Sequence, residues 1–352
     1  IAQSSLKYSD EIGTLEPVNI IDSVEWLKNA AKSGSLVAQN NLGTMRTIEE
    51  GVQKAQSGIF KKHYIFARTG NARTQFTLAF IYDNGIGVAE DNIFAVDYYQ
   101  KAANQGLVVA QFGLAWMHKH GEGIEKNETA AVKWYLLAAK QDFLAAQFNL
   151  GCIYNDGIGE YEDIYEAIKW YLLAANQGLA QAQYNIGYIY DSGEDIPEDN
   201  KEAVKWYKLA AEQGLGAAQY TLARMYDFGE GVEGDKEQAV KWYRKAALQD
   251  IAPSQYMLGY MYDHGLGIEE DNIEAVKWYR NAANQGFVPA KFSLAWMYDS
   301  GQGVLKNNRE AYKWYLMAAE EGYVPAEYNL GLLHDSRKSL NKNRMETLKW
   351  HH

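Results

Sequence analysis

The sequence contains one cysteine, Cys152, among its 352 residues. A single thiol cannot form an internal disulfide, so it neither requires an oxidising compartment nor excludes one. Only five prolines occur, and no apolar run is long enough to cross a bilayer as a helix. Basic residues are outnumbered, and the net charge of −11 disfavours nonspecific binding to the phosphates of nucleic acids.

What the chain has in quantity is repetition. Hydrophobic residues make up 47% and charged residues 22%, a balance typical of a folded protein. One tryptophan position recurs every 36 residues without an insertion, and Tyr98, Lys62 and Trp26 stand in the slots before it. The recurring residues are Trp134, Trp170, Trp206, Trp242, Trp278, Trp314 and Trp350. A fixed period of this length predicts a repeat protein.

Each repeat has the pattern of two helices. In "AAQFNLGCIYNDG", Ala146, Leu150, Gly151 and Tyr154 recur at spacings of three and four, which indicates one face of a first helix. Glycines such as Gly157 follow where a tight turn needs positive φ. The second helix carries stretches such as "AVKWYKLAA".

Capping residues mark the two ends of each second helix. Glutamate three residues after the N-cap completes a capping box in five repeats, as Glu202 does after Asp199. Glycine at the C′ position, such as Gly286, is replaced in two repeats by Asp142 and Asp250, where we expect looser corners. The predicted N-caps are Asp91, Asn127, Asp163, Asp199, Asp235, Asp271, Asn307 and Asn343.

These patterns predict an all-α fold, an α-solenoid superhelix of about nine 36-residue helix-turn-helix repeats with atypical ends. One hairpin cannot bury its apolar face alone, so neighbouring repeats must stack. The predicted organisation is an N-terminal lead (1–20), a leading half repeat of one helix (21–37), a degenerate repeat (38–73), seven regular repeats (74–325) and a truncated C-terminal repeat (326–352).

The tryptophan column is interpreted as packing, because function seldom needs one residue in every repeat. The lysine before each tryptophan, such as Lys205, invites a phosphate-binding interpretation. Each capping-box glutamate lies three residues before its lysine, however, as Glu202 does before Lys205. We therefore expect a solvated, ion-paired face.

The whole pattern, A-x-x-x-L-G-x-x-Y-x-x-G-x-G-V/I and then D-x-x-x-A-x-x-W-Y-x-x-A-A-x-x-G, resembles the Sel-one-like repeat, a relative of the tetratricopeptide repeat. The resemblance covers nearly the whole chain and weakens at the ends, where Arg46 replaces the tyrosine and Lys62 the tryptophan. The repeat from Ala218 to Pro253 matches through Leu222, Tyr226, Gly229, Gly231, Val232, Asp235, Ala239, Trp242, Tyr243, Ala246 and Ala247.

The resemblance implies an adaptor or scaffold that assembles protein complexes. Bacterial members of the family are frequently secreted or envelope proteins, some linked to infection of host cells. By analogy with the tetratricopeptide arrangement, one face of the first helices lines a concave groove. We expect recognition to use positions that packing leaves free to vary between repeats.

Two columns of the first helix form the candidate partner-binding site. One column varies between repeats and lies two residues before the tyrosine position, and a near-constant aromatic column lies four residues earlier. The alternative is that these rings fill the core, and that the nearby aspartates Asp83, Asp191, Asp227, Asp263 and Asp299 serve turns. The predicted binding residues are Phe76, Phe80, Phe112, Trp116, Tyr184, Tyr188, Arg224, Tyr256, Tyr260, Phe292 and Trp296.

No catalytic or metal-binding constellation is evident, and no cofactor is predicted. His118 and His120 are two apart on a helix and would not face one metal, and His118 stands in a tyrosine slot that indicates packing. Cys152 is interpreted as a small core or groove residue. The G-x-G pairs lie between helices rather than after a strand, so they do not indicate a nucleotide site.

Two functions remain in contention. The first is a non-enzymatic adaptor that binds a partner peptide or domain in the aromatic groove, with a secreted bacterial protein that engages host-cell proteins as its most concrete form. The second is a membrane-associated regulator that binds anionic, phosphoinositide-type headgroups through a basic face. We expect a monomer without nucleic-acid partners. Because the sequence begins at Ile1 without methionine, a secreted or envelope location is favoured over the cytoplasm.

Overall fold

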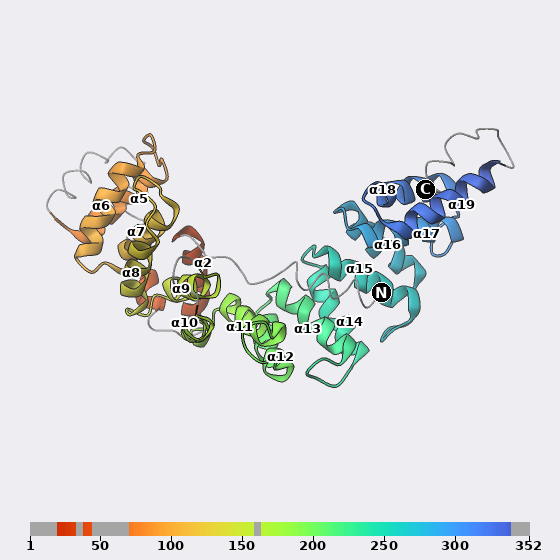
Figure 1. Ribbon diagram of the computed structural model, residues 1–352, viewed down its shortest axis with the longest axis horizontal. Helices are drawn as coiled ribbons and strands as arrows, with labels where there is room; N and C mark the ends of the chain where they lie inside the picture. The colour runs from red at the N-terminus through yellow and green to blue at the C-terminus, as the bar shows by residue number, and fades with distance from the viewer. Residues whose placement is uncertain (1–19, 33–37, 44–69, 158–162, 339–352) are drawn as a thin grey trace. The chain divides into compact units, whose positions relative to one another are not determined.

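The computed structural model describes residues 20–32, 38–43, 70–157 and 163–338. Within these ranges the regular structure is entirely helical and consecutive helices pack in pairs, which confirms the predicted fold class (Figure 1). The helices belong to two compact units, divided between Glu198 and Asp199. The predicted N-cap Asn343 lies outside the described residues.

The N-terminal unit contains α2 and the repeats that run from α5 to α11. Its helices are α2 (Ile20–Lys32), α5 (Ala72–Asp83), α6 (Asn92–Asn104), α7 (Val108–His120), α8 (Glu128–Ala139), α9 (Leu144–Asn155), α10 (Ile164–Asn176) and α11 (Ala180–Ser192). The odd-numbered helices from α5 onward are the first helices of the repeats.

The C-terminal unit continues the same alternation of first and second helices. Its helices are α12 (Asn200–Glu212), α13 (Gly216–Phe228), α14 (Lys236–Ala247), α15 (Ala252–His264), α16 (Asn272–Asn284), α17 (Val288–Ser300), α18 (Asn308–Glu320) and α19 (Val324–Lys338).

The second helices begin at the predicted N-caps, but the capping box forms in a different way. The Asp271 carboxylate accepts from the backbone N–H groups of Ile273 and Glu274. The Asp271 N–H donates to the carbonyl of Tyr262 at the end of the first helix, over 2.9 Å. With that donor already engaged, the Glu274 side chain pairs with Lys277 on the next turn. The N-cap residue thus joins the two helices of its hairpin.

The corners follow the predicted backbone. Gly286 has a φ of 94°, and Asp142 and Asp250 adopt φ of 58° and 61° where two repeats lack the glycine. A turn glycine such as Gly303 is required for close approach as well. A Cβ on Gly303 would lie 2.0 Å from the carbonyl oxygen of Asn272, at the start of the preceding second helix.

The centre of each repeat is the tyrosine that follows the tryptophan, rather than the tryptophan itself. Trp170, Trp242 and Trp314 retain 9% exposure, and the other described tryptophans of the column are partly buried. The tyrosine ring lies on a glycine of the first helix, where a Cβ on Gly151 would come within 2.4 Å of Tyr171. In this column Tyr99, Tyr135, Tyr171, Tyr207, Tyr243, Tyr279 and Tyr315 are each at most 1% exposed.

A ladder of paired side-chain amides joins successive repeats. Gln141, at the end of a second helix, donates to the Oε1 of Gln111 on its own repeat's first helix, 2.7 Å away. Gln111 in turn donates to the carbonyl oxygen of Ala103, in the preceding repeat. The pairs are Gln105–Gln75, Gln141–Gln111, Gln177–Gln147, Gln249–Gln219 and Gln285–Gln255. In the repeat at α17 and α18, both positions change together, and Lys291 pairs with Glu321.

We predict that the Lys291–Glu321 pair behaves as a unit. Lys291 is 4% exposed, so Glu321→Gln leaves a buried ammonium without its carboxylate and should lower the free energy of unfolding by about 1–3 kcal/mol. The double variant Lys291→Gln/Glu321→Gln recreates the amide pair of the other repeats and should recover most of that loss. Urea unfolding of the four proteins in the cycle measures this coupling. Additive losses in the double variant would contradict it.

The core tyrosine also reaches the aspartate at the end of its first helix. The Tyr99 hydroxyl donates to Asp83 over 2.9 Å, and Tyr279 does so to Asp263 over 3.2 Å. Burial raises the pKa of Asp83 to about 6, although the hydrogen bond from Tyr99 lowers it. These aspartates therefore serve the core of the hairpin, which supports their structural interpretation.

We predict that Asp83→Asn removes a pH-dependent loss of stability. The folded chain holds the Asp83 proton more tightly than the unfolded chain, because the pKa is about 6 when folded and 3.8 otherwise. Its contribution to stability is therefore largest below pH 4 and declines as the pH rises to 6, by about 1–2 kcal/mol for a partly exposed group. Denaturation from pH 4 to 7 should show this decline in the native chain and a smaller one in Asp83→Asn. The exposed Asp97→Asn is the control, and equal pH slopes in all three proteins would contradict the prediction.

Candidate functional site on the first-helix face

The variable column supplies the accessible aromatic rings of the first helices. We call the surface that these residues form within each unit the first-helix face. Phe80, Trp116, Tyr188 and Tyr260 are partly buried, and Trp296 is 39% exposed. They come from α5, α7, α11, α15 and α17, so each lies at the same place on its own helix. These five residues are predicted site residues that a partner can reach.

Three residues of the near-constant aromatic column lie in the core, which corrects the prediction that they line a groove. Phe76, Phe112 and Tyr184 are at most 1% exposed. Tyr256 and Phe292 are partly buried, and their rings pack on the core tyrosines Tyr279 and Tyr315, with centroids 5.7 and 5.5 Å apart. Each near-constant aromatic lies four residues before a variable-column residue. At that position on the first helix, its side chain points toward the second helix.

Arg224 is the other predicted site residue that does not reach solvent. It occupies the variable column on α13 but is 5% exposed, and its guanidinium lies 3.2 Å from the carboxylate of Glu230. A buried cation needs such a partner, so Arg224 serves the turn after its own helix.

Two rings of the first-helix face are held by histidines one turn later. Trp116 stacks on His120 with centroids 3.8 Å apart, and Tyr260 stacks on His264 at 4.1 Å. Each histidine Nδ1 lies 3.0 Å from the carbonyl oxygen of the residue on which it stacks. The side chains are thereby ordered before binding, which reduces the entropy lost when a partner docks. Burial raises the pKa of the neighbouring Asp263 carboxyl, and the charge of His264 acts in the opposite direction and lowers that pKa.

The lysine column is ion-paired with the capping-box glutamate in three described repeats, at Lys169, Lys205 and Lys277. Lys169 lies 2.8 Å from Glu166 and Lys205 lies 2.5 Å from Glu202. Lys241 differs because Gln238 stands where the glutamate would be. The missing glutamate is a signal in the sequence that points to a local basic site on α14.

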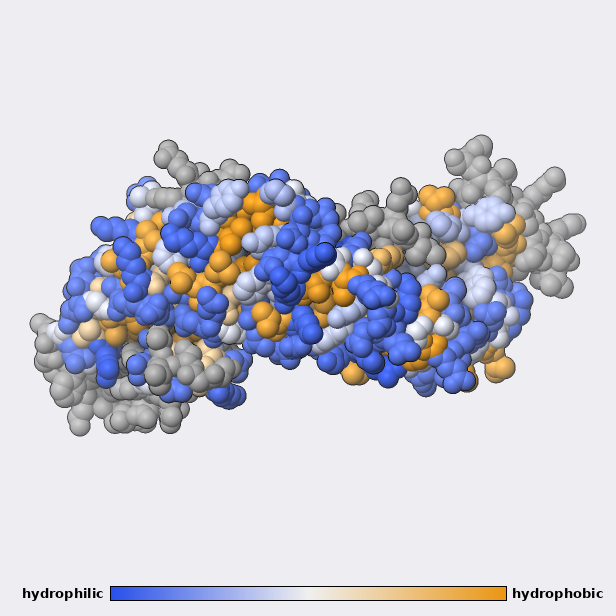
Figure 2. All heavy atoms as spheres, turned by 90° about the horizontal axis from the view of Figure 1, so that it is seen from below, coloured by the Kyte–Doolittle hydropathy of each residue, from blue (hydrophilic) through white to orange (hydrophobic). Residues whose placement is uncertain are grey.

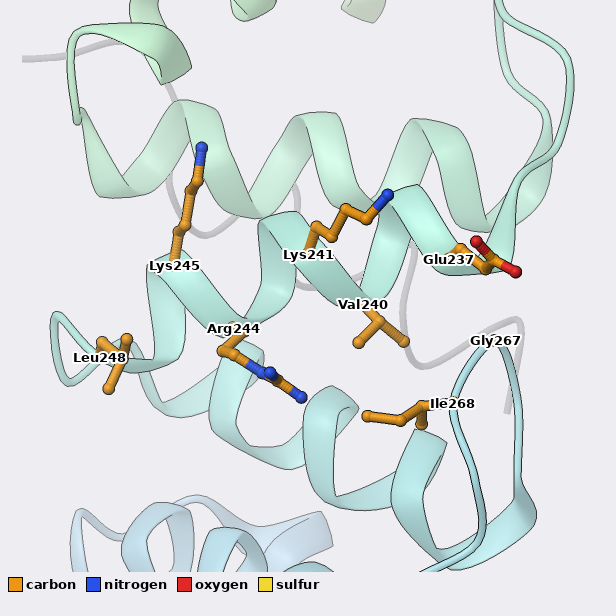
Figure 3. Close-up of a pocket in the computed structure, with 8 residues that line it drawn as sticks. All are labelled: Glu237, Val240, Lys241, Arg244, Lys245, Leu248, Gly267 and Ile268. Atoms are coloured by element: carbon orange, nitrogen blue, oxygen red, sulfur yellow. The ribbon is translucent and has the colours of Figure 1, made fainter.

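A pocket of about 410 Å³ opens beside Lys241, between α14 and the turn before α16 (Figure 3). Lys241 and Lys245 project from one side of α14, and Arg244 extends from the adjacent side together with Val240, toward Ile268. The remaining lining residues are Glu237, Leu248 and Gly267. Arg244 donates to the Tyr262 hydroxyl over 2.7 Å, and the Lys245 ammonium lies 3.9 Å from the centre of the Trp242 ring. The pocket thus combines positive charge with an apolar wall.

Other chemistry was sought among the same residues. Cys152 is 1% exposed. His118 is buried, as expected for a residue in a tyrosine position, and desolvation lowers its pKa. Within the described ranges, no group of histidine, cysteine, aspartate and glutamate side chains could hold a metal ion. No helix in the same ranges has the length and hydrophobicity to cross a membrane. On the face drawn in Figure 2, hydrophobic residues are exposed in separate orange areas, and most of that face is hydrophilic.

Comparison with known proteins identifies the repeat. The family model of the Sel1 repeat matches residues 6–35, 72–107, 108–143, 144–179, 180–215, 216–251, 252–287, 288–323 and 324–352. The match at 6–35 adds a repeat where the sequence predicted a lead and half repeat. A comparison with curated proteins gave no match.

Two solved structures share this fold at appreciable identity. One is c5321, a protective antigen present in uropathogenic Escherichia coli strains, which displays an SLR fold. It is 32% identical with a TM-score of 0.79, and the alignment covers 95% of this chain and 70% of c5321. The other is a Sel1 repeat protein from Oxalobacter formigenes, 28% identical with a TM-score of 0.67, over 91% of this chain and 96% of that one. The matched repeats span most of the sequence, and the resemblance drawn from its motifs is confirmed: the chain belongs to the Sel1 repeat family.

Proposed function

We propose that the chain is a non-enzymatic scaffold that binds a partner peptide or domain on its first-helix face. The Sel1 repeat fold generally serves as a scaffold for protein–protein interaction. The observation that carries the proposal is the exposure of Trp296, 39%, on a helix whose other large rings are partly or fully buried. Large aromatic residues left accessible at ordered positions are typical anchors of protein interfaces.

The nature of the partner is a finer proposal. c5321, at 32% identity, is a protective antigen in uropathogenic strains, which supports a bacterial protein that meets host cells. We therefore propose a secreted or envelope-bound monomer whose partners are host-cell proteins. The net charge of −11 favours partners with basic surfaces and disfavours nucleic acid.

We predict that the rings of the first-helix face are required for capture of the partner. Trp116→Ala and Trp296→Ala, singly and together, should reduce capture from host lysates at least tenfold, because each removes an aromatic anchor. Quantitative mass spectrometry of the captured proteins, followed by titration of the purified partner, measures the loss. Circular dichroism must first show that each variant retains its helices.

Leu305→Ala is the matched control, since Leu305 is 89% exposed and lies outside the first helices. It should leave capture unchanged. Undiminished capture by the folded double tryptophan variant would rule out the first-helix face as the recognition surface. Capture from bacterial rather than host lysates would rule out host proteins as the partners.

The α14 pocket favours a second candidate function, binding of anionic phosphoinositide-type headgroups. Lys241, Arg244 and Lys245 bring three cations to one pocket, and Val240 and Leu248 give it apolar wall. Lys241 lacks the intrahelical glutamate of its counterparts, so its charge is available to a ligand. Each basic residue near an anionic surface contributes about 1 kcal/mol to binding.

We predict that binding to vesicles with 5% phosphoinositide, if this function holds, falls at least tenfold in Lys241→Ala/Lys245→Ala and falls with added salt. Lys169→Ala/Lys205→Ala is the control, because those lysines are paired with glutamates. Sedimentation with vesicles of neutral lipid alone gives the baseline. Equal sedimentation with neutral and anionic vesicles would eliminate this candidate.

A further inference from the structure

α2 lies against two first helices of the N-terminal unit. It packs against α7 and α9, which belong to two consecutive repeats, and Figure 1 draws it in red beside α9. Both helices carry a position of the variable column, Trp116 on α7 and Cys152 on α9. A helix of the chain itself therefore packs on the same two helices that carry these positions.

The contact has the character of a docked helix. The ring of Trp26 meets the ring of Phe148 on α9 at 87°, with centroids 5.1 Å apart, an edge-to-face arrangement. Leu27 has no exposed surface and Ala30 is 6% exposed. Ala30 lies three residues after Leu27 and four after Trp26, so it lies between them on the helix surface, and these three residues define the anchoring side of α2.

The size of residue 152 matches this contact. On the neighbouring first helices the variable column carries the rings of Trp116 and Tyr188, both partly exposed. Cys152 is smaller than either and lies one turn after Phe148, yet it is only 1% exposed. Trp26 packs on Phe148, one turn before Cys152, so a large side chain at position 152 would crowd the place where α2 approaches α9.

We infer that the side of α7 and α9 on which α2 packs is a receptor for an amphipathic helix, and that α2 is its resident occupant. The partner that fits is a helix of a second protein with an aromatic residue, leucine directly after it and alanine four residues after the aromatic, the pattern of Trp26, Leu27 and Ala30. Such a partner binds by displacing α2. The inference deepens the proposed function and rests on it for the existence of a partner. The docking of α2 does not depend on the proposed function.

Its place in the same chain makes α2 a competitor with a defined effect. Because α2 and its receptor belong to one chain, α2 is present at a high local concentration. A partner helix must overcome this local concentration, so its apparent Kd rises with the occupied fraction of the receptor. Weakening α2 in the full chain should therefore tighten the binding of a helix added in trans.

The test uses a fluorescent peptide of residues 18–34 and measures anisotropy with the full-length chain. The peptide should bind Trp26→Ala at least tenfold more tightly than the native chain, because the resident helix is released. Adding Cys152→Trp to Trp26→Ala should abolish peptide binding by crowding the place where α2 approaches α9. Cys152→Ser is the matched control and should leave peptide binding intact.

Hydrogen exchange in the full chain gives a second readout. Cys152→Trp alone, and Leu27→Asp alone, should speed exchange of the α2 amides and leave those of α13–α18 unchanged. Leu27→Asp changes α2 alone, so it tests the docking of α2 even where tryptophan at position 152 disturbs the packing of α9. Unchanged α2 exchange in both variants would overturn the inference.

Three other results would also overturn it. One is equal peptide affinity for the native chain and Trp26→Ala, and another is full binding by the Cys152→Trp double variant. The third is a native dimer that Trp26→Ala converts to a monomer in sedimentation, because α2 would then dock between copies. No lysate is used, so loss of the receptor is distinguishable from loss of the partners tested under the proposed function.

Discussion

The packing of one tyrosine ring on a first helix is the contact on which the rest of the structure depends. Tyr171 lies so close to Gly151 that a methyl group on the glycine would overlap the ring. The same ring meets Phe148, with centroids 5.6 Å apart. Because each described repeat from α5 to α18 buries an equivalent tyrosine, the distance between the two helices of these hairpins is set by the same side chain. A regular distance within hairpins is what allows successive hairpins to stack with one period.

Polar contacts then determine the register of that stack. The Gln141–Gln111 amide pair is tied to Ala103 of the preceding repeat, so a shift of one residue would leave buried amides without partners. The replacement of such a pair by Lys291 and Glu321 indicates that the requirement is for a donor and an acceptor, rather than for glutamine. Hydrophobic contacts supply most of the free energy, whereas these pairs select one arrangement among many of similar burial.

The sequence predicts the features that depend on neighbours along the chain. N-caps such as Asp271 and left-handed corners such as Asp142 lie where expected, because both follow from the local backbone. Adjacent tryptophan and tyrosine point about 100° apart on a helix, and a period of 36 cannot tell which of them turns inward. Phe112 is misplaced for the same reason: Phe112 and Trp116 share a face in sequence, but Phe112 is buried by Tyr135 and Phe143 from other segments.

Long-range contacts also explain why α2 could not be placed from its motif. Trp26 stands in the tryptophan column of a repeat, which predicts stacking on the following hairpin, yet it packs on Phe148 of α9. The position of Trp26 depends on whether a surface elsewhere in the chain packs better against its ring than the following hairpin does. The repeats offer few such surfaces. Most columns are fixed by packing, so only a substitution in the variable column can create a local hole without weakening the stack. Cys152 is the small residue of that column on α9, one turn after Phe148, and in the described residues Trp26 packs on α9 at Phe148.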